Sequence, residues 1–178
     1  MPRTVLCVHF PEETILKVAS EPKKIATAIN GAQAVIGAYA PPKDDPDAIV
    51  GATQRLIDAV GGGSSARLIV VGGAGGLFVA PGVTLVESGY VPEPFLPISR
   101  AHVKAFNVLR ASTIDWTYLA PAAYFTPGER TGKFRLGKDE LIANAQQESR
   151  ISMEDYAIAL VDEIEVPRHH RQRFSVGY

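Results

Sequence analysis

Apolar runs alternate with amphipathic segments through the middle of the chain, and this order predicts strands and helices in turn. The continuous apolar runs at residues 32–40 ("AQAVIGAYA") and 67–73 ("RLIVVGG") are typical of strands buried on both faces of a sheet. Apolar residues spaced three and four positions apart predict helices over residues 45–60 and 98–112. We therefore expect a strand, a helix, a second strand and a second helix in succession.

Shorter segments extend this pattern towards both ends of the chain. β-Branched apolar runs predict strands at residues 4–10 ("TVLCVHF") and 14–20 ("TILKVAS"), and residues 21–30 read as a short helix. The segment 115–125 ("DWTYLAPAAYF") predicts a strand that turns at a proline, and residues 171–178 predict a final strand.

Two helix starts carry capping signals. Asp45 and Pro46 fit the N-cap and first helical positions of the helix over 45–60. Ser152 and Asp155 have the spacing of a capping box at the start of a helix within residues 150–166. Asp155 and its neighbour are therefore better explained as helix N-terminal charges than as catalytic acids.

The alternation predicts an α/β fold with a doubly wound, mostly parallel sheet covered by helices on both faces, formed by a single domain over residues 1–178. In such sheets ligands bind beyond the carboxyl ends of the strands. Those ends carry the sequences "AYAPP", "GGAGG" and "PAAYF".

Composition narrows the class of partner. The net charge of -1, from 18 basic and 19 acidic residues, gives no reason to expect nucleic acid. We expect no membrane segment, because no apolar run reaches the roughly 18 residues that a membrane helix needs. The single cysteine and the absence of Cys/His clusters with zinc spacing predict no metal site, and a start without signal-peptide features favours the cytoplasm.

Several segments, in order, resemble one protein family. They include "GAQAVIGAYAPP", "RLIVVGGAGGL", "LRASTIDWTYLAPAAYFTPGERTGKFRLG" and "SRISMEDYAIALVDEIEVPRHHRQRFSVGY". Together they resemble the NADH-flavin reductase-like group of atypical short-chain dehydrogenases, which are NAD(P)-binding Rossmann proteins related to NmrA-like regulators and to biliverdin reductase B. The resemblance covers roughly residues 14–178.

The resemblance implies NAD(P)H as cofactor and a small-molecule acceptor, such as a flavin, that receives a hydride. It also implies which residues lie near the nicotinamide or the acceptor. His102 is the catalytic candidate because relatives carry a histidine at this place in the helix. The cofactor-binding candidates are Ala38, Tyr39, Gly72, Gly73, Ala74, Gly75, Gly76, Pro121, Ala122, Ala123 and Tyr124.

The chain departs from the family at its start. Such proteins open with a strand and a G-x-x-G-x-x-G turn that lets the backbone approach a pyrophosphate, whereas no glycine precedes Gly31 here. The first strand-turn-helix unit is therefore expected to be truncated or replaced. If residues 4–10 correspond to the family's second strand, a central strand is missing, and a homodimer or a replacement strand could cover the edges. If they take the first strand's place, the sheet closes without a phosphate loop.

Residues 72–76 cannot replace that loop, because Phe78 stands where a glycine is needed and no helical run follows. They are expected either to line the nicotinamide or to form a tight turn without a ligand. The chain also lacks the Tyr-x-x-x-Lys pair of conventional short-chain dehydrogenases. Tyr39 and Lys43 match the spacing, but the two prolines between them forbid the helix that the pair requires.

The remaining candidates each have a structural alternative. His102 faces inward on the helix and is either a ligand contact or a hydrogen-bonded core histidine, while Lys104 points to solvent. Residues 121–124 allow a flat ring to stack, or they form a proline kink with packed alanines. The basic residues Arg130, Lys133 and Arg135 form a phosphate-binding patch or, more simply, a solvated hairpin.

Two functions follow. One is an NAD(P)H-dependent oxidoreductase that passes a hydride to a flavin or quinone-like acceptor, a reaction that needs orientation and exclusion of water more than a strong acid. The other is a non-catalytic, truncated Rossmann domain that acts as a binding or regulatory module, and the absent glycine fingerprint favours it.

Overall fold

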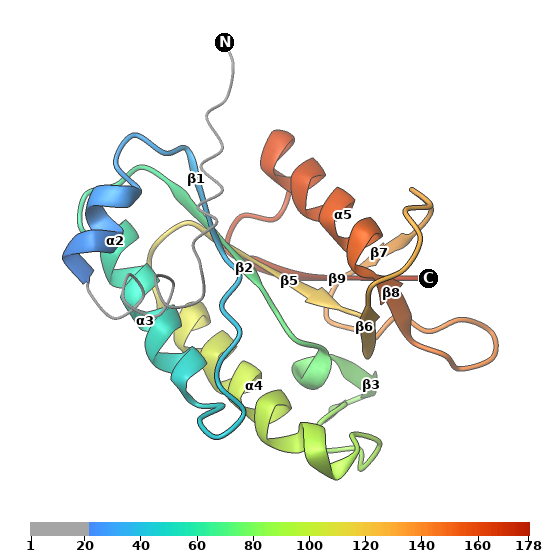
Figure 1. The fold of residues 1–178 in the computed structure, drawn as a ribbon. Coiled ribbons are helices and arrows are strands. Elements are labelled where there is room, and N and C mark those ends of the chain that lie inside the picture. The colour runs from blue at the N-terminus through green and yellow to red at the C-terminus, as the bar shows by residue number, and fades with distance from the viewer. Residues whose placement is uncertain (1–21) are drawn as a thin grey trace.

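A computed structural model describes residues 22–178, and its centre is a five-stranded sheet with helices on both faces (Figure 1). Across the sheet the strands are β1 (Ala34–Gly37), β2 (Arg67–Val71), β5 (Trp116–Pro121), β9 (Gln172–Gly177) and β7 (Arg135–Gly137). The first four run parallel, and β7 pairs antiparallel with β9. The predicted α/β, Rossmann-like fold is confirmed, while the strands predicted at 4–10 and 14–20 lie outside the described residues.

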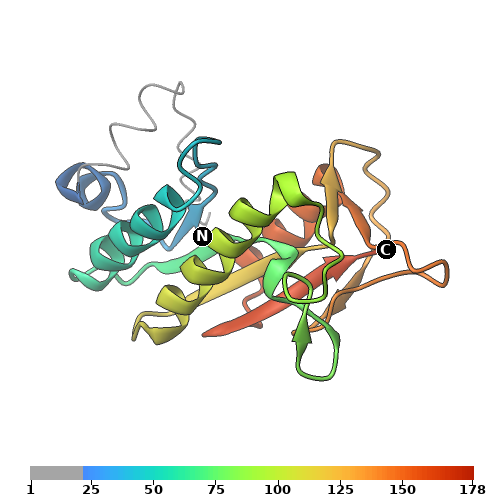
Figure 2. The same ribbon diagram turned by 90° about the horizontal axis from the view of Figure 1, so that it is seen from below.

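The helices divide between the two faces of the sheet. One face carries α2 (Pro22–Ala28), α3 (Ala48–Gly61) and α4 (Leu96–Ala111), and the other carries α5 (Met153–Glu165), as Figure 2 shows. Strand β2 has apolar side chains for helices to cover on both faces of the sheet, because successive side chains of a strand point to opposite faces. Leu68 and Val70 pack in the core beneath α2, α3 and α4, whereas Ile69 packs against Ile164 of α5.

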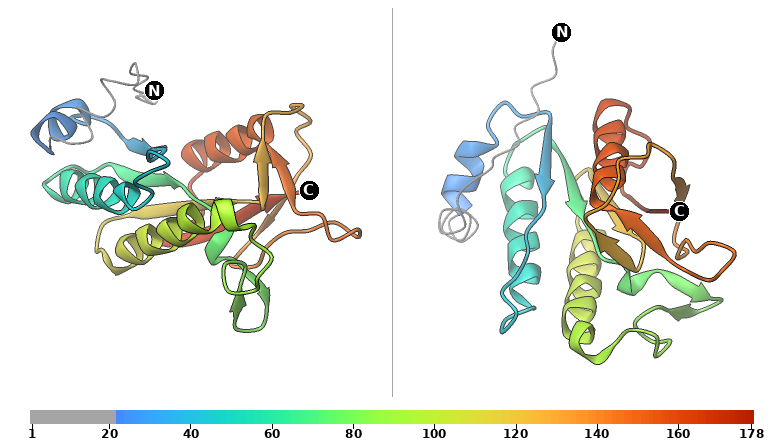
Figure 3. Two further views of the ribbon diagram at one scale, coloured as in Figure 1. Left: turned by 60° about the horizontal axis from the view of Figure 1, so that its bottom comes forward. Right: turned by 45° about the vertical axis from the view of Figure 1, so that its right-hand side comes forward.

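Short elements gather where the parallel strands end (Figure 3). They are η1 (Ala74–Gly76), β3 (Phe78–Ala80), β4 (Val83–Thr84), η2 (Glu93–Phe95), β6 (Tyr124–Thr126) and β8 (Arg150–Ser152). Strands β3 and β4 pair antiparallel, and β6 and β8 pair parallel. The proline- and glycine-rich segment between β2 and α4 thus contains a small hairpin and two 3-10 turns, and it leads directly into α4.

One predicted helix start was wrong. Helix α3 begins at Ala48 with Asp47 at the N-cap, because the carbonyl of Asp45 accepts from the Ala48 amide and closes a separate turn before the helix. The basic segment 126–140, expected to be a loop or a hairpin, contains a loop and strand β7, and β7 pairs with β9 of the main sheet.

The start of α5 matches its prediction. The Ser152 hydroxyl oxygen accepts a hydrogen bond from the Asp155 amide at 3.0 Å, as an N-cap does. Ile151 and Tyr156, on either side of the cap, are 1% and 3% exposed and pack in one cluster. None of the helices within residues 22–178 is long and apolar enough to cross a membrane.

Candidate functional site

The carboxyl ends of β1, β2 and β5 meet at one edge of the sheet, because these neighbouring strands are parallel. Ala38 and Tyr39 follow β1, residues 72–76 follow β2, and Ala122 and Ala123 follow β5. The fold therefore brings the ends of the three predicted segments to the same side of the molecule. This edge is where a sheet of this type binds its ligand.

The first two glycines after β2 lie against aromatic rings of the protein itself. A Cβ atom on Gly72 would lie 2.2 Å from Cε1 of Tyr118, and one on Gly73 would lie 2.8 Å from Cγ of His102. The Tyr118 hydroxyl accepts a hydrogen bond from the Gly73 amide at 2.9 Å. Only glycine fits at these positions, since real Cβ atoms do not approach other heavy atoms so closely.

The next two glycines are less tightly enclosed. A Cβ on Gly75 would lie 3.0 Å from the Ser99 carbonyl oxygen, and one on Gly76 would lie 3.0 Å from Nη1 of Arg173, the end of a long side chain. Packing inside the protein therefore accounts for Gly72 and Gly73, as the interpretation of a tight turn without a ligand requires. Contact between this turn and a nicotinamide stays a prediction.

His102 of α4 lies against the Gly73 end of this turn. Burial lowers the pKa of its imidazole from 6.5 to about 4, so the ring is neutral at pH 7. Its Nδ1 atom is buried and has no hydrogen-bond partner among the described residues. The inward orientation is confirmed, but a hydrogen-bonded core histidine would not leave this atom unpartnered.

The neighbouring Lys104 points away, as predicted. Its side chain is 57% exposed, and the ammonium lies 2.6 Å from a carboxylate oxygen of Asp47 at the start of α3. The spacing match of Tyr39 and Lys43 is also without helical support, because residues 38–47 lie between the end of β1 and the start of α3. Tyr39 instead packs against the cluster formed by α3 and α4.

Two buried tyrosines lie beneath the carboxyl ends of β2 and β5. Burial raises the pKa of Tyr118 to about 12 and that of Tyr156 well above 10. The Tyr156 hydroxyl donates to the Leu119 carbonyl oxygen at 2.9 Å. Both phenols therefore stay protonated at neutral pH and hold the ends of β2 and β5.

Arg173 of β9 holds the glycine turn through a hydrogen bond to its last residue, Gly76. The sequence analysis did not predict this role. Its guanidinium donates to the Gly76 carbonyl oxygen at 2.8 Å and pairs with Asp139 at 2.6 Å. Its Cζ atom also lies 4.6 Å from the centre of the Phe106 ring. Its three partners come from distant segments, so no local pattern in the sequence indicates these contacts.

The segment after β5 divides into buried and exposed parts. Pro121 is buried and pairs with Val176 of β9, and Ala122 packs beside α5 with 2% of its surface exposed. Ala123 is exposed, and its amide donates to the Ser149 hydroxyl at 3.0 Å. Tyr124 is 64% exposed. Ala123 and Tyr124 are thus open at the edge, whereas Pro121 and Ala122 belong to the core.

Asp155 anchors the loop that follows β6, a contact that the capping pattern did not reveal. Its carboxylate accepts from the Thr131 hydroxyl, from the Gly132 amide at 2.8 Å and from the Tyr178 hydroxyl at 2.9 Å. Burial alone would raise the pKa of Asp155, but these hydrogen bonds lower it below its ordinary value. The carboxylate is therefore structural.

The three basic residues of this region differ in their surroundings. Arg135 donates to the carbonyl oxygens of Ala143 and Tyr178, so its guanidinium is engaged within the protein. Arg130 and Lys133 are exposed on the anchored loop. A role for them in phosphate binding stays a prediction.

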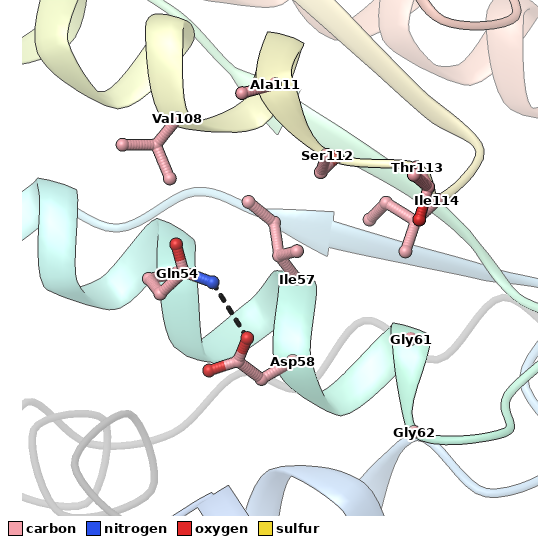
Figure 4. Close-up of a pocket in the computed structure, with 10 residues that line it drawn as sticks. All are labelled: Gln54, Ile57, Asp58, Gly61, Gly62, Val108, Ala111, Ser112, Thr113 and Ile114. Carbon is pink, nitrogen blue, oxygen red and sulfur yellow. Dashed lines mark hydrogen bonds between the residues drawn. The ribbon is translucent and has the colours of Figure 1, made fainter.

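A hollow of about 730 Å³ lies near the amino ends of the parallel strands, on the side of the sheet away from the glycine turn (Figure 4). Ile57 from the end of α3 and Val108 from the end of α4 line it, together with Ile114 ahead of β5. Gln54 donates to Asp58 across its rim at 2.7 Å. Because these residues precede β2 and β5, the hollow is separate from the carboxyl ends of the strands.

Comparison with known proteins identifies the family. A model of the NAD(P)H-binding family matches residues 10–165. The chain belongs to this NAD(P)H-binding family. The resemblance that the sequence motifs indicated is thereby confirmed.

Similar proteins span most of this NAD(P)H-binding chain. YwnB of Bacillus subtilis, named an uncharacterized protein, is 40% identical over 147 residues, which are 80% of this chain and 69% of YwnB. The structure of a Burkholderia pseudomallei protein, named a candidate exported protein, is 42% identical to this chain, with a TM-score of 0.83. The match covers 90% of this chain and 78% of the Burkholderia chain. The structure of a Streptococcus pneumoniae protein, named a candidate NADH-flavin reductase, is 31% identical, with a TM-score of 0.79, and the match covers 85% of this chain and 74% of the Streptococcus chain.

A more distant structure shows the fold alone. A short-chain dehydrogenase/reductase from Veillonella parvula, in complex with NADP, is 20% identical to this chain and has a TM-score of 0.63. It covers 90% of this chain, and this chain covers 69% of it.

Small side chains are exposed on both sides of the glycine turn. Ala38 follows β1 and Ala123 follows β5, and contact between either residue and a nicotinamide stays a prediction. A G-x-x-G-x-x-G turn, which would hold the pyrophosphate, does not occur in residues 22–178. The nicotinamide end is therefore the part of the cofactor that these residues could hold.

Proposed function

We propose that the protein is an NAD(P)H-dependent oxidoreductase that passes a hydride to a flavin or quinone-like acceptor. The observation that carries this proposal is the match of residues 10–165 to the NAD(P)H-binding family, in a parallel sheet whose carboxyl ends bring three predicted segments to one edge. His102 lies against the glycine turn at this edge, and its imidazole is neutral at pH 7.

The chain's own residues orient the ligand and exclude water. When bound, the reduced nicotinamide supplies the hydride, so no strong protein acid is required. Ala38 and Ala123 leave room for the ring, and the Gly72 turn, stiffened by Tyr118, gives a fixed wall. His102 would offer a neutral hydrogen-bonding group to the cofactor or to the acceptor.

Binding and turnover with purified protein test the proposal. NADPH and NADH are titrated by calorimetry, and oxidation is followed with FMN, FAD and a benzoquinone as acceptors. We expect micromolar binding of one nucleotide and turnover with at least one acceptor. No binding at millimolar nucleotide would contradict the proposal.

A matched pair of variants on α4 tests the role of His102. His102→Asn keeps a polar group of similar shape, and we expect kcat/KM to fall at least about tenfold, which is about 1.4 kcal/mol of transition-state stabilisation. Lys104→Ala changes an exposed ion pair on the same helix, and its kcat/KM should stay within about twofold. Equal activity in both variants would remove His102 from the site.

The second candidate function is a non-catalytic binding or regulatory module. The absence of a pyrophosphate-binding glycine turn from residues 22–178 favours it. Nucleotide binding without oxidation in the presence of any acceptor would support this alternative.

A further inference from the structure

A second hollow, of about 280 Å³, lies beside the C-terminal half of α5. Its lining comes from α5, from residues 166–169 after the helix, from Phe174 of β9, and from Phe134 and Leu136 at β7. None of the candidate residues at the carboxyl edge of the sheet lines it. We call it the α5 hollow, and it is separate from the proposed nicotinamide site.

His169 belongs to the lining of the α5 hollow, and its imidazole is held in one orientation. Its Nδ1 atom is 2.7 Å from Oε2 of Glu163, which lies in the last turn of α5. The ring also stacks on Phe174, with centroids 4.0 Å apart and planes inclined by 12°. A flipped ring would lose the hydrogen bond, so Nε2 is the ring nitrogen that faces away from Glu163.

The ionised carboxylate of Glu163 fixes the tautomer of this histidine. Burial alone would raise the pKa of Glu163, but hydrogen bonds from His169, from two backbone amides and from Arg67 lower it below its ordinary value. The guanidinium lies 2.7 Å from Oε1 of the carboxylate, and the amides of Arg168 and His169 lie 3.0 Å from the same oxygen. An ionised carboxylate only accepts, so Nδ1 of His169 carries the hydrogen and Nε2 of the neutral ring is an acceptor.

The Nε2 atom of His169 is open to a ligand. No described residue forms a hydrogen bond with it, and it is not one of the buried side-chain atoms that lack a partner. A carboxylate orients metal-ligating histidines in the same way, but no group of three His, Cys, Asp or Glu side chains within residues 22–178 could hold a metal ion. An organic hydrogen-bond donor is therefore the expected partner of this atom.

The other lining residues indicate which donor would fit. Apolar side chains form much of the lining, namely Phe134, Leu136, Ala159, Val166 and Phe174. Leu136 and Val166 are 48% and 55% exposed, so a ligand would cover apolar surface that now faces water. The exposed charges of the lining have both signs, with Asp162 and Glu165 beside Arg168, so a neutral ligand suits the α5 hollow better than an ion.

We propose that the α5 hollow binds a small phenol, whose hydroxyl donates to Nε2 of His169 and whose ring packs against the apolar lining. A phenol keeps its hydrogen at pH 7, since its pKa is about 10. Phe134 and Phe174 favour an aromatic ring over an aliphatic chain. The volume of about 280 Å³ is just below the roughly 300–1,000 Å³ of pockets for drug-sized ligands, so a molecule with a single ring fits. Glu163 is a positioning residue, because it orients the imidazole without touching the ligand.

Two probes of the unaltered protein test whether the ligand must be a donor. The phenol para-cresol carries a hydroxyl, and para-methylanisole has the same ring with that hydroxyl methylated. We expect saturable binding of para-cresol by calorimetry, and binding of the ether that is at least about fivefold weaker because one hydrogen bond is lost. Equal affinities, or no binding of para-cresol up to its solubility, would overturn the proposal.

A matched pair of variants tests whether His169 receives the hydroxyl. In His169→Asn the side-chain amide can still donate to Glu163 from the place of Nδ1, but nothing replaces Nε2. His170→Asn is the control, because His170 is 57% exposed and pairs with Asp115 outside the hollow. The affinity for para-cresol should fall at least about fivefold in His169→Asn and stay within about twofold in His170→Asn. Equal affinities in the two variants would assign the contact elsewhere and overturn the proposal.

Nitrogen NMR keeps the proposal testable if His169→Asn does not fold. In the unaltered protein, the signals of the two ring nitrogens of His169 report which one carries the hydrogen and whether a donor reaches the other. We expect Nδ1 to be protonated in the neutral ring, and the Nε2 signal to move on addition of para-cresol but not of the ether. A hydrogen on Nε2 of the neutral ring, or an Nε2 signal that para-cresol does not move, would also overturn the proposal.

Discussion

Gly72 and Gly73 lie between rings contributed by a strand and a helix, and their hydrogen side chains allow that arrangement. Tyr118 approaches from the next strand, and His102 approaches from α4. The turn is therefore as much a product of these two rings as of the glycines themselves.

Replacing Gly72 with alanine should destabilise the fold through overpacking. The new Cβ would lie 2.2 Å from the buried Tyr118 ring, so strand β5 or the turn must shift, at a cost of about 1–3 kcal/mol. Urea unfolding measures the change. The control is Gly61→Ala at the end of α3, where the nearest atom is 3.4 Å from the new Cβ and the higher helix propensity of alanine should make the change neutral or stabilising. Equal losses in both variants would contradict this explanation.

The half-buried imidazole of His102 should make the fold sensitive to acid. Its pKa is about 4 in the folded protein and 6.5 for an ordinary histidine, so the unfolded chain binds the proton more readily between these values. Stability contributed by the neutral ring is therefore complete above about pH 6.5 and is lost as the pH falls towards 4, by about 2–3 kcal/mol. Urea unfolding of His102→Asn across this range should show a shallower dependence on pH. An unchanged slope would show that other groups cause the acid sensitivity.

At the scale of elements, α5 is fixed at both ends by a buried carboxylate. Asp155 holds the loop after β6 at the helix start, and Glu163 holds the start of β2 at the helix end. The hydrophobic stripe of α5 gives its position on the sheet, and the two carboxylates connect it to segments distant in sequence.

Asp155→Ala should release the loop that follows β6. The Gly132 amide and the hydroxyls of Thr131 and Tyr178 lose their acceptor, and we expect a loss of about 2–3 kcal/mol. Limited proteolysis should cut near residues 126–134 first. Asp162→Ala, at an exposed position of the same helix, should leave the loop resistant. Similar cleavage of the two variants would show that Asp155 does not anchor the loop.

The pair of Arg67 and Glu163 should show strong energetic coupling. The two side chains are 7% and 3% exposed and lie 2.7 Å apart, and Glu163 also accepts from the amides of Arg168 and His169. Glu163→Leu alone leaves a buried guanidinium and should cost about 3–5 kcal/mol. In a double-mutant cycle with Arg67→Met, the combined loss should be at least about 1 kcal/mol smaller than the sum. Simple additivity would contradict a coupled pair.

Features that depend on neighbouring residues in the sequence could be predicted, whereas contacts between distant segments could not. The strands around residues 34–37 and 67–71, and the cap at Ser152, were predictable because their signals are local in sequence. The start of α3 was displaced because Asp45 and Pro46 favour a turn as readily as a first helical turn. The contacts of Arg173 were missed because its partners come from separate segments. Sequence patterns report periodicity and turn chemistry, but they do not report which distant side chain fills a space.

At the scale of the molecule, a bound nucleotide should stabilise the whole fold. A ligand that binds only the native state at a hundred times its Kd adds about 2.7 kcal/mol to the free energy of unfolding. For a chain of this size we expect Tm to rise by about 5–10 °C. Differential scanning fluorimetry with NADPH and NADH measures the change, with adenosine as the control ligand. No shift at saturating nucleotide would mean that the folded protein does not bind it.

The chain also carries its own optical reporter. Trp116 is the single tryptophan, it is 3% exposed, and it lies on β5, the strand whose far end reaches the proposed nicotinamide edge. Its ring packs edge-on against Phe106 of α4, with centroids 6.0 Å apart, so its emission should be that of an indole shielded from water. Reduced nicotinamide absorbs at the wavelengths where such an indole emits. Quenching of this one fluorophore, with sensitised emission from the nucleotide, would therefore report occupancy of the edge without any added label.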